Sequence, residues 1–310
     1  MADIRAIDIS KKFNDKLILD KISFKLNKGE VLSIVGRSGS GKSTLLKILA
    51  GIINNYDGDV FFDDNNIKSL DIRKRKFILM FQDAELFPHM NIHDNVAFGL
   101  KMQGEKSDFI EKETNRYLDL VGLIDHKDKY PNQISGGERQ RVSLVRSLIV
   151  KPNMLLLDEP FSALDESLRA NLRNETFKII KEHNIPTLFV THDINEAVEV
   201  SDKMAILKNG KFIAYDKPRN IYENPKNLAT AKFIFKDNII DNMLIKKSDI
   251  EIVAGNSYQI LEKIYRGDYY TYKIHGKYSL FVDSRDEYDI NDRIDIRIKN
   301  KIILEENWKK

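Results

Sequence analysis

The sequence predicts an α/β layered domain followed by a small all-β module. Short β-rich runs alternate with longer helical patterns in the first part, which is typical of an α/β domain. From about residue 237, apolar and polar residues alternate instead, as in Tyr270, Tyr272 and Ile274. We therefore expect an α/β domain over residues 1–236, with an inserted, mainly helical segment over about 84–150, and a small β-barrel over residues 237–310.

The elements of the first domain follow from the pattern of apolar residues. The β-rich runs are residues 4–9, Val31–Val35, 154–157 and 187–190. Two of them, Val31–Val35 and 154–157, are apolar throughout except for Ser33, which suits strands buried on both faces, although so short a run could also belong to a helix. Residues 44–50 and Glu166–Glu182 are predicted helices. In the second domain, turn signals stand at Gly255-Asn256, Gly267-Asp268 and Gly276-Lys277.

Composition and charge limit the classes of partner and site. Lys and Arg number 50 against 47 Asp and Glu, so the net charge of +3 gives no indication of a nucleic-acid partner. The chain has no cysteine, which excludes disulfides, thiolate metal sites and cysteine nucleophiles. No apolar run follows Asp3 and Arg5, and no stretch reaches the roughly 18 apolar residues of a membrane span, so we expect neither signal peptide nor transmembrane helix.

A glycine-rich loop predicts a triphosphate site. Residues 36–43 read Gly36-Arg37-Ser38-Gly39-Ser40-Gly41-Lys42-Ser43 and satisfy G-x-x-x-x-G-K-[ST] between a predicted strand and a predicted helix. The glycines let backbone N–H groups point at phosphates, and the helix N-terminus adds its positive end. We expect the whole loop and Thr44 to bind ATP, with Lys42 on the β- and γ-phosphates and Ser43 on Mg²⁺. A glycine-rich turn with an incidental lysine is the alternative, and the flanking elements disfavour it.

The apolar run at 154–157 ends in two carboxylates, Asp158 and Glu159. Neighbouring residues on a strand face opposite ways, so the two acids should have different roles. We expect Asp158 to hold Mg²⁺ through water, and Glu159 to orient or deprotonate the attacking water. A solvated acidic pair is the alternative, and it is disfavoured because Lys42 is also present.

Ile134-Ser135-Gly136-Gly137-Glu138-Arg139-Gln140 resembles the signature sequence of ABC ATPases. Other elements of that family follow in order, and the resemblance covers residues 1 to about 235. They are Phe13 as the A-loop aromatic, Gln82 in the Q-loop, residues 162–165 ending in Asp165 as the D-loop, and His192 as the switch histidine. The signature departs from the commoner form, which begins with Leu and has Gln where this chain has Glu138.

The resemblance implies roles for these residues. In the family, Ser135, Gly136 and Gly137 contact the ATP held by a second copy of the chain, and Asp165 lies at the interface of the two. His192 would contact the γ-phosphate, and Gln82 would reach Mg²⁺ or the attacking water. Phe13 would stack on adenine, although an aromatic residue near the start of a domain is more often part of a core. His89 and His93 are interpreted as loop or surface residues rather than a metal pair.

Residues 87–99 and 221–228 resemble the import ATPases for ferric iron, polyamines, sulfate, molybdate and sugars. That group carries a C-terminal β-domain of the TOBE type, and residues 265–272 are its most similar piece here. The resemblance implies an ATP-hydrolysing importer subunit on the cytoplasmic face of the membrane. Its expected partners are a second copy of itself, an integral membrane permease and, indirectly, a solute-binding protein. Residues 84–90, beside Gln82, are the expected socket for a permease helix.

Other functions stay open from the sequence. A soluble ABC ATPase acting on nucleic acid or ribosomes and an exporter subunit are the main alternatives. A non-catalytic nucleotide sensor is disfavoured because Lys42, Asp158, Glu159 and His192 are all present. The C-terminal module could be regulatory or could only stabilise a dimer, and the solute, polyamine or ferric iron, is not determined.

Overall fold

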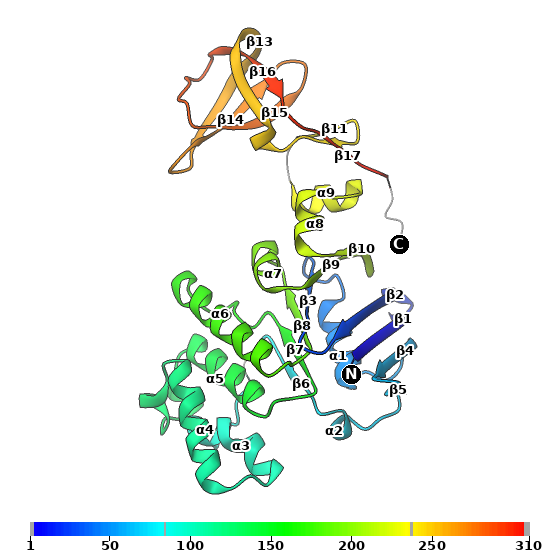
Figure 1. The fold of residues 1–310 in the computed structure, drawn as a ribbon, viewed down its shortest axis with the longest axis vertical. Helices are drawn as coiled ribbons and strands as arrows, with labels where there is room; N and C mark the ends of the chain where they lie inside the picture. Colours follow the sequence, from blue (N-terminus) through cyan, green and yellow to red (C-terminus); the bar gives the residue numbers. More distant parts are fainter. Residues whose placement is uncertain (1–2, 84, 236–237, 307–310) are drawn as a thin grey trace. The chain divides into compact units, whose positions relative to one another are not determined.

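The computed structural model describes residues 3–83, 85–235 and 238–306 (Figure 1). Contacts divide the chain into two compact units, Met1–Pro218 and Arg219–Lys310. The sequence pattern put the division later, at residues 236 and 237, which lie outside the described residues, as does Ala84 at the start of the expected helical segment. The difference arises because the helix Leu228–Ile234 packs with the C-terminal strands, through Leu228 and Ala231.

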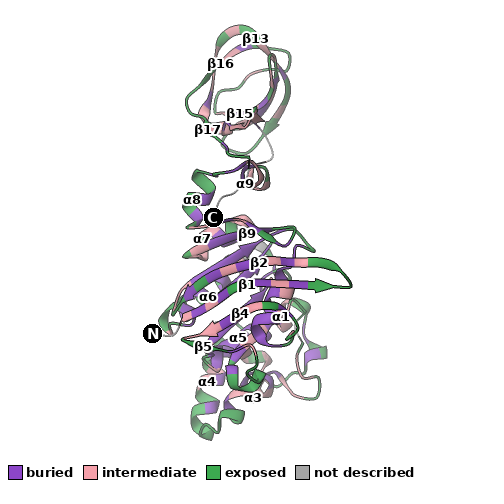
Figure 2. Cartoon of the chain, turned by 90° about the vertical axis from the view of Figure 1, so that its right-hand side faces the viewer, coloured by how far each residue is buried: buried purple, intermediate pink, exposed green. Residues whose placement is uncertain are grey.

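A six-stranded sheet forms the centre of the first unit, in the order β10-β9-β3-β8-β7-β6. Its strands are β3 (Val31–Val35), β6 (Phe77–Met80), β7 (Met154–Asp158), β8 (Thr187–Thr191), β9 (Lys203–Lys208) and β10 (Lys211–Asp216). β3, β7 and β8 are buried along their whole length. Figure 2 shows buried residues along β9 of the same sheet. The two apolar runs are thus strands covered on both faces, because β3, β6, β7, β8 and β9 run parallel.

Four of the described helices of this unit lie outside the inserted segment. They are α1 (Lys42–Ala50), α2 (Ile72–Arg75), α6 (Glu166–Glu182) and α7 (Ile194–Val200). The expected helix Glu166–Glu182 is confirmed, and Asp165 caps its start by accepting a hydrogen bond from the Leu168 N–H at 3.3 Å. α1 begins directly after the glycine-rich loop, and it ends where Gly51 takes a left-handed conformation at φ 85°.

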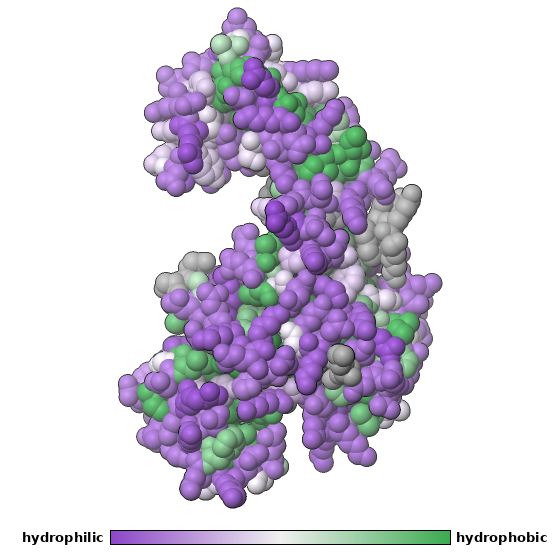
Figure 3. All heavy atoms as spheres, viewed as in Figure 1, coloured by the Kyte–Doolittle hydropathy of each residue, from purple (hydrophilic) through white to green (hydrophobic). Residues whose placement is uncertain are grey.

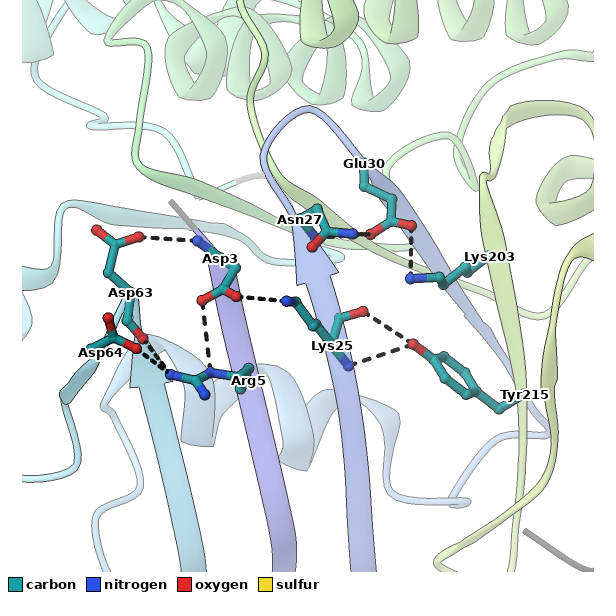
Figure 4. Close-up of polar contacts among 9 residues, drawn as sticks. All are labelled: Asp3, Arg5, Lys25, Asn27, Glu30, Asp63, Asp64, Lys203 and Tyr215. Carbon is teal, nitrogen blue, oxygen red and sulfur yellow. Dashed lines mark hydrogen bonds and ion pairs between the residues drawn. The ribbon is translucent and has the colours of Figure 1, made fainter. Parts of the chain in front are cut away.

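An antiparallel sheet in the order β2-β1-β4-β5 lies at the N-terminal end of the unit. Its strands are β1 (Asp3–Phe13), β2 (Lys16–Asn27), β4 (Asp57–Phe62) and β5 (Asn65–Asn66). Polar contacts tie these strands together and to the central sheet (Figure 4). Asp3 pairs with Lys25 at 2.8 Å, and the Tyr215 hydroxyl of β10 donates to the Lys25 carbonyl at 3.0 Å. The Tyr215 hydrogen bond therefore joins this sheet to β10 of the central one.

The inserted segment is helical, as expected. It contains α3 (Ile92–Gln103), α4 (Ser107–Leu120), α5 (Gly136–Ile149) and the 3-10 turns Ile124–His126 and Pro131–Gln133. α3, α4 and α5 lie side by side (Figure 1) and share an apolar core with residues of the central sheet.

The second unit contains α8 (Pro218–Glu223), α9 (Leu228–Ile234), two antiparallel sheets and the 3-10 turn Lys247–Asp249. One sheet pairs β11 (Ile239–Ile240), β12 (Met243–Leu244) and β17 (Ile302–Ile303), and the other has the order β15-β14-β13-β16. The latter strands are β13 (Ile250–Tyr265), β14 (Tyr270–His275), β15 (Ser279–Ser284) and β16 (Arg293–Ile298). Their buried faces form an apolar core, and the predicted fold class, an α/β core with an inserted helical segment followed by a small all-β module, is confirmed.

One of the three expected turns is not a turn. Gly267-Asp268 and Gly276-Lys277 lie between strands as expected, but Gly255-Asn256 lies inside β13, where the pairing with β16 shifts register. A Cβ at Gly255 would lie 2.0 Å from a carboxylate oxygen of Asp295, so the glycine permits a close approach of strands rather than a chain reversal.

Among the described helices, none is both long and apolar enough to cross a membrane.

Candidate nucleotide-binding site

The topology of the central sheet gathers the expected site residues at one edge. Val35 pairs with Thr191, Asp158 with Val190, and Met80 with Leu157, all in parallel register. Each of these carboxyl ends carries or precedes expected site residues. They are the glycine-rich loop after β3, the acidic pair at the end of β7, His192 after β8 and Gln82 after β6. Carboxyl ends of parallel strands are where ligands bind in open α/β sheets.

Two glycines show why the loop needs its composition. Gly41 caps α1 at φ 110°, and a Cβ there would lie 2.8 Å from the Leu19 side chain. A Cβ at Gly36 would lie 2.6 Å from the Leu207 carbonyl oxygen. A side chain at either position would therefore displace the backbone, so the loop holds its N–H groups in one arrangement.

Lys42 is the buried cation of the loop. It is 6% exposed, and its Nζ donates to the carbonyls of Gly36 at 2.8 Å and Arg37 at 3.2 Å. Burial lowers the pKa of Lys42, while the charges of Glu159 and Asp158 act in the opposite direction. Arg37, Ser38, Gly39 and Ser43 are exposed and Thr44 is partly exposed, so the loop presents several of its expected ATP contacts to solvent.

The donor set fits a phosphate. The Ser40 hydroxyl oxygen is buried and, within the described part of the chain, has no hydrogen-bond partner. It stands beside a cation and backbone N–H groups at the N-terminus of α1. A buried hydroxyl without a partner is costly, and a phosphate oxygen in the loop would supply one.

Asp158 and Ser43 form the candidate magnesium ligands. Asp158 is 8% exposed, and burial raises the pKa of its carboxyl group. The neighbouring Ser43 hydroxyl, which can donate to the carboxylate, lowers this pKa in turn. One carboxylate and one hydroxyl are oxygen ligands of the kind Mg²⁺ accepts, with water and phosphate completing the shell. The described residues contain no cluster of three or more His, Asp or Glu side chains arranged to hold a metal.

Glu159 and His192 meet across the ends of β7 and β8. The Nδ1 atom of His192 lies 3.0 Å from Oε2 of Glu159. His192 is 65% exposed, whereas the Glu159 side chain is only 14% exposed. The Glu159 backbone is in the left-handed region at φ 48°, which is uncommon and costly for this residue type.

Phe13 and Gln82 are accessible but lie outside this contact network. Phe13 is 46% exposed, and the Lys11 ammonium lies 4.7 Å from its ring centroid. One side of the ring is therefore taken by a cation, which leaves the other for stacking. Gln82 is exposed just after β6.

Ser135 starts the signature helix, α5. Its hydroxyl accepts a hydrogen bond from the Glu138 N–H at 3.2 Å, and the Glu138 carboxylate accepts one from the Ser135 N–H at 2.7 Å. This reciprocal capping lowers the pKa of Glu138, with His126, 2.9 Å away, as a further cause. Glu138 thus has a local structural role, while Ser135 and Gly136 remain exposed and Gly137 partly exposed.

Gln140 is the last residue of the signature motif, and the motif by itself predicts no separate role for it. It is 2% exposed on α5, and its side-chain amide contacts the turn that begins with Glu159. No spacing rule marks such a contact, because it joins residues 19 positions apart that meet only in the fold. Asp165, at the far end of the same turn, is exposed.

A groove of about 430 Å³ adjoins the Q-loop. Phe81, Glu85, Phe87, Met102 and Arg146 are among its lining residues. The Arg146 guanidinium donates to the Glu85 carbonyl at 2.7 Å and lies 5.3 Å from the Phe87 ring centroid. Figure 3 shows hydrophobic side chains reaching the surface over the helical segment, on an otherwise mainly hydrophilic face.

The groove matches the expected socket only in part. Phe87 and Glu85 line it, but Leu86 packs against the apolar core of the helical segment instead. Ala84 lies outside the described residues.

Comparison with known proteins gives a consistent result. The sequence profile described as ABC transporter matches residues 19–162, which include the glycine-rich loop, the signature and the acidic pair. The chain is 40% identical over 254 residues to the spermidine/putrescine import ATP-binding protein of Fusobacterium nucleatum, covering 82% of this chain and 68% of that protein. It is 40% identical over 248 residues to the protein of the same description from Spiroplasma citri, covering 80% and 71%. It is 37% identical over 253 residues to the Fe(3+) ions import ATP-binding protein of F. nucleatum, covering 82% and 68%.

Proposed function

Because the chain belongs to the ABC transporter family as an importer-type ATP-binding subunit, we propose that it closes as a dimer on two ATP molecules and drives solute uptake through a separate permease. The protein binds ATP, and it is an ATPase coupled to transport. The observation that carries the proposal is the gathering of Lys42, Asp158, Glu159 and His192 at one sheet edge.

The loop and Lys42 hold the β- and γ-phosphates, and Ser43, Asp158 and Gln82 would hold Mg²⁺. The ion would neutralise charge on the phosphate oxygens when it is bound. Support comes from the unpartnered Ser40 hydroxyl and from the Ser43 hydroxyl that neighbours Asp158. Phe13 stacks on the adenine through the ring face that Lys11 leaves free.

Glu159 orients the attacking water and accepts its proton. His192, 3.0 Å from the Glu159 carboxylate, holds that carboxylate in place and contacts the γ-phosphate. Its high exposure suits a group that completes its contacts only when nucleotide is present.

The second half of each ATP site comes from the other copy of the chain. Ser135, Gly136 and Gly137 present the N-terminus of α5 to the partner's γ-phosphate, and Asp165 lies at the interface. Reciprocal capping by Glu138 supports this assignment, because it satisfies the Ser135 N–H and keeps the serine in a fixed place at the helix start.

The groove beside the Q-loop receives a cytoplasmic helix of the permease. Its lining by Phe81, Phe87 and Met102 offers an apolar seat, and Arg146 fixes the backbone at Glu85. The chain then acts at the cytoplasmic face of the membrane, peripherally, and meets a solute-binding protein only through the permease. No role with nucleic acid is proposed.

The solute is a polyamine or ferric iron. Relatives with these two printed specificities are 40% and 37% identical to the chain, so the ATPase sequence hardly distinguishes them. Specificity belongs to the permease and the solute-binding protein.

The test of this function is the Glu159→Gln variant. Glutamine keeps the shape of the side chain but cannot accept the proton, so ATP hydrolysis should fall by at least about 100-fold. ATP binding should remain, and the variant should form an ATP-dependent dimer, measured by size-exclusion chromatography with light scattering. Near-normal hydrolysis would remove Glu159 from its role, and a monomer at saturating ATP would remove the dimer.

A further inference from the structure

The Gln140 side chain joins the signature helix to the catalytic turn of the same chain. Its Nε2 donates to the Glu159 carbonyl at 3.2 Å and to the Ser162 hydroxyl oxygen at 3.5 Å. Its Oε1 accepts from the Ala163 N–H at 3.1 Å. One amide on α5 thus bonds to both ends of residues 159–163, the turn between β7 and α6.

The Glu159 carbonyl is the centre of this turn. Besides Gln140, it accepts from the Ser162 hydroxyl at 3.0 Å and from the Ser162 N–H at 3.2 Å. The residue itself stands at φ 48°, a conformation that its surroundings must impose. The Glu159 N–H is held from β8, where the Val190 carbonyl accepts it at 2.9 Å, whereas Gln140 links the Glu159 carbonyl to α5. The position of α5 therefore acts on the carbonyl side of this residue.

Packing adds to the same link. A Cβ at Gly137 would lie 3.3 Å from the Ala163 carbonyl oxygen and 3.3 Å from the Leu164 side chain. The first turn of α5 therefore rests directly on the turn that leads to Asp165. A shift of the signature helix along this contact changes the Gln140 hydrogen bonds before it changes any apolar packing, because hydrogen bonds weaken steeply with distance and angle.

We propose that Gln140 is a positioning residue that couples the two ATP sites of the dimer. The inference rests on the proposed function, in which Ser135 faces the partner's ATP while Glu159 acts on the chain's own ATP. Gln140 connects these two groups within one chain. Binding or loss of the γ-phosphate at one site moves α5, and the amide carries that movement to the backbone of the glutamate at the other site.

The test replaces the amide without changing its size. Gln140→Met keeps the length and volume of the side chain and removes all three hydrogen bonds. Gln103→Met makes the same change at an exposed glutamine of α3 and is the matched control. For each protein, the rate of ATP hydrolysis is measured against ATP concentration, with the melting temperature as a check of folding.

The expected result is a loss of cooperativity. The Hill coefficient, which can approach 2 for two coupled sites, should fall toward 1 in Gln140→Met and stay at the wild-type value in Gln103→Met. The maximal rate should also fall, by about tenfold. The ATP affinity of the monomeric chain, measured with a fluorescent ATP analogue, should stay the same.

A second variant separates positioning from packing. Gln140→Glu keeps the acceptor for Ala163 but donates to Glu159 only when its buried carboxyl group is protonated. Its activity relative to wild type should therefore rise as pH is lowered from about 8 to about 6, whereas the ratio for Gln140→Met should not change with pH. A purely structural role would give no such difference.

The outcomes distinguish this inference from its premise. If Glu159→Gln forms no ATP-dependent dimer, the proposed function fails, whatever Gln140 does. If that dimer forms, and either the wild type is not cooperative or Gln140→Met keeps its cooperativity, the coupling role of Gln140 is overturned while the proposed function stands.

Discussion

At the residue scale, the site contains a buried cation, Lys42, and a buried carboxylate, Asp158, and burial disfavours the charged form of each. Burial lowers the pKa of Lys42 and raises that of Asp158, so each group is held in an environment that disfavours its charged form. Each also lowers the cost for the other by its opposite charge. A charged ligand with its counter-ion would satisfy both groups, which is the physical basis for placing phosphate and magnesium between them.

Lys42→Ala should weaken ATP binding itself. The variant loses a charge-assisted contact worth about 1.5–3 kcal/mol, which corresponds to a loss of affinity of roughly 10- to 100-fold. Titration with a fluorescent ATP analogue measures it, and Lys28→Ala, at an exposed turn, is the control. An affinity equal to that of the control would count against the role of the loop.

At the element scale, the start of α5 combines a structural cap with a proposed phosphate contact. Glu138 replaces the commoner glutamine without loss of the cap, because either residue can accept the Ser135 N–H. The charge adds a pH dependence. The folded-state pKa of Glu138 is lowered from 4.5, so its stabilising effect is complete well above that value and is lost as pH falls through the lowered pKa.

Glu138→Ala should therefore destabilise the protein in a pH-dependent way. We expect the free energy of unfolding to fall by about 1 kcal/mol at pH 7, and by less as the pH is lowered below about 4. Urea unfolding at several pH values measures the difference. Glu138→Gln keeps the cap and should lose most of the pH dependence, and equal destabilisation by alanine at every pH would contradict this account.

The groove is the second feature at this scale, and it separates ATP hydrolysis from coupling. Met102→Glu puts a charge on its rim, at a residue that is 69% exposed, so folding should be little affected. We expect hydrolysis by the isolated chain to stay within about twofold of wild type, and co-purification with the permease from detergent extracts to be lost. Unchanged co-purification would argue against the groove as the docking surface.

At the scale of the whole molecule, the chain divides into two compact units, Met1–Pro218 and Arg219–Lys310. α9 contributes Leu228 and Ala231 to an apolar cluster with Leu244 and Leu304, which belong to the β-strand region or directly follow it. A boundary after Pro218 leaves this cluster whole, whereas one at residue 236 divides it.

Truncation tests that boundary. A fragment of residues 1–218 should be recovered folded in better yield than one of residues 1–236, because the longer fragment exposes the apolar face of α9. Soluble yield and limited proteolysis compare the two. Equal yield and equal protease resistance would favour the boundary that the sequence pattern indicated.

The sequence by itself determined the parts of the site that depend on local order along the chain. The glycine-rich loop, the acidic pair and the buried strands could be predicted because composition and spacing fix backbone conformation over a few residues, as Gly41 at φ 110° illustrates. The expected turn at Gly255-Asn256 was wrong because local sequence does not decide the conformation there. Its glycine serves a contact with Asp295, which is distant in sequence.

The tertiary structure alone decided which groups touch. His192 and Glu159 are 33 positions apart, and they meet at 3.0 Å because β7 and β8 are neighbours in a parallel sheet. Gln140 reaches the Glu159 carbonyl because α5 packs on the turn after β7, and α9 belongs to the second unit because its apolar residues find partners there. Strand order and helix packing follow from burial summed over the whole chain, so no short stretch of sequence contains them.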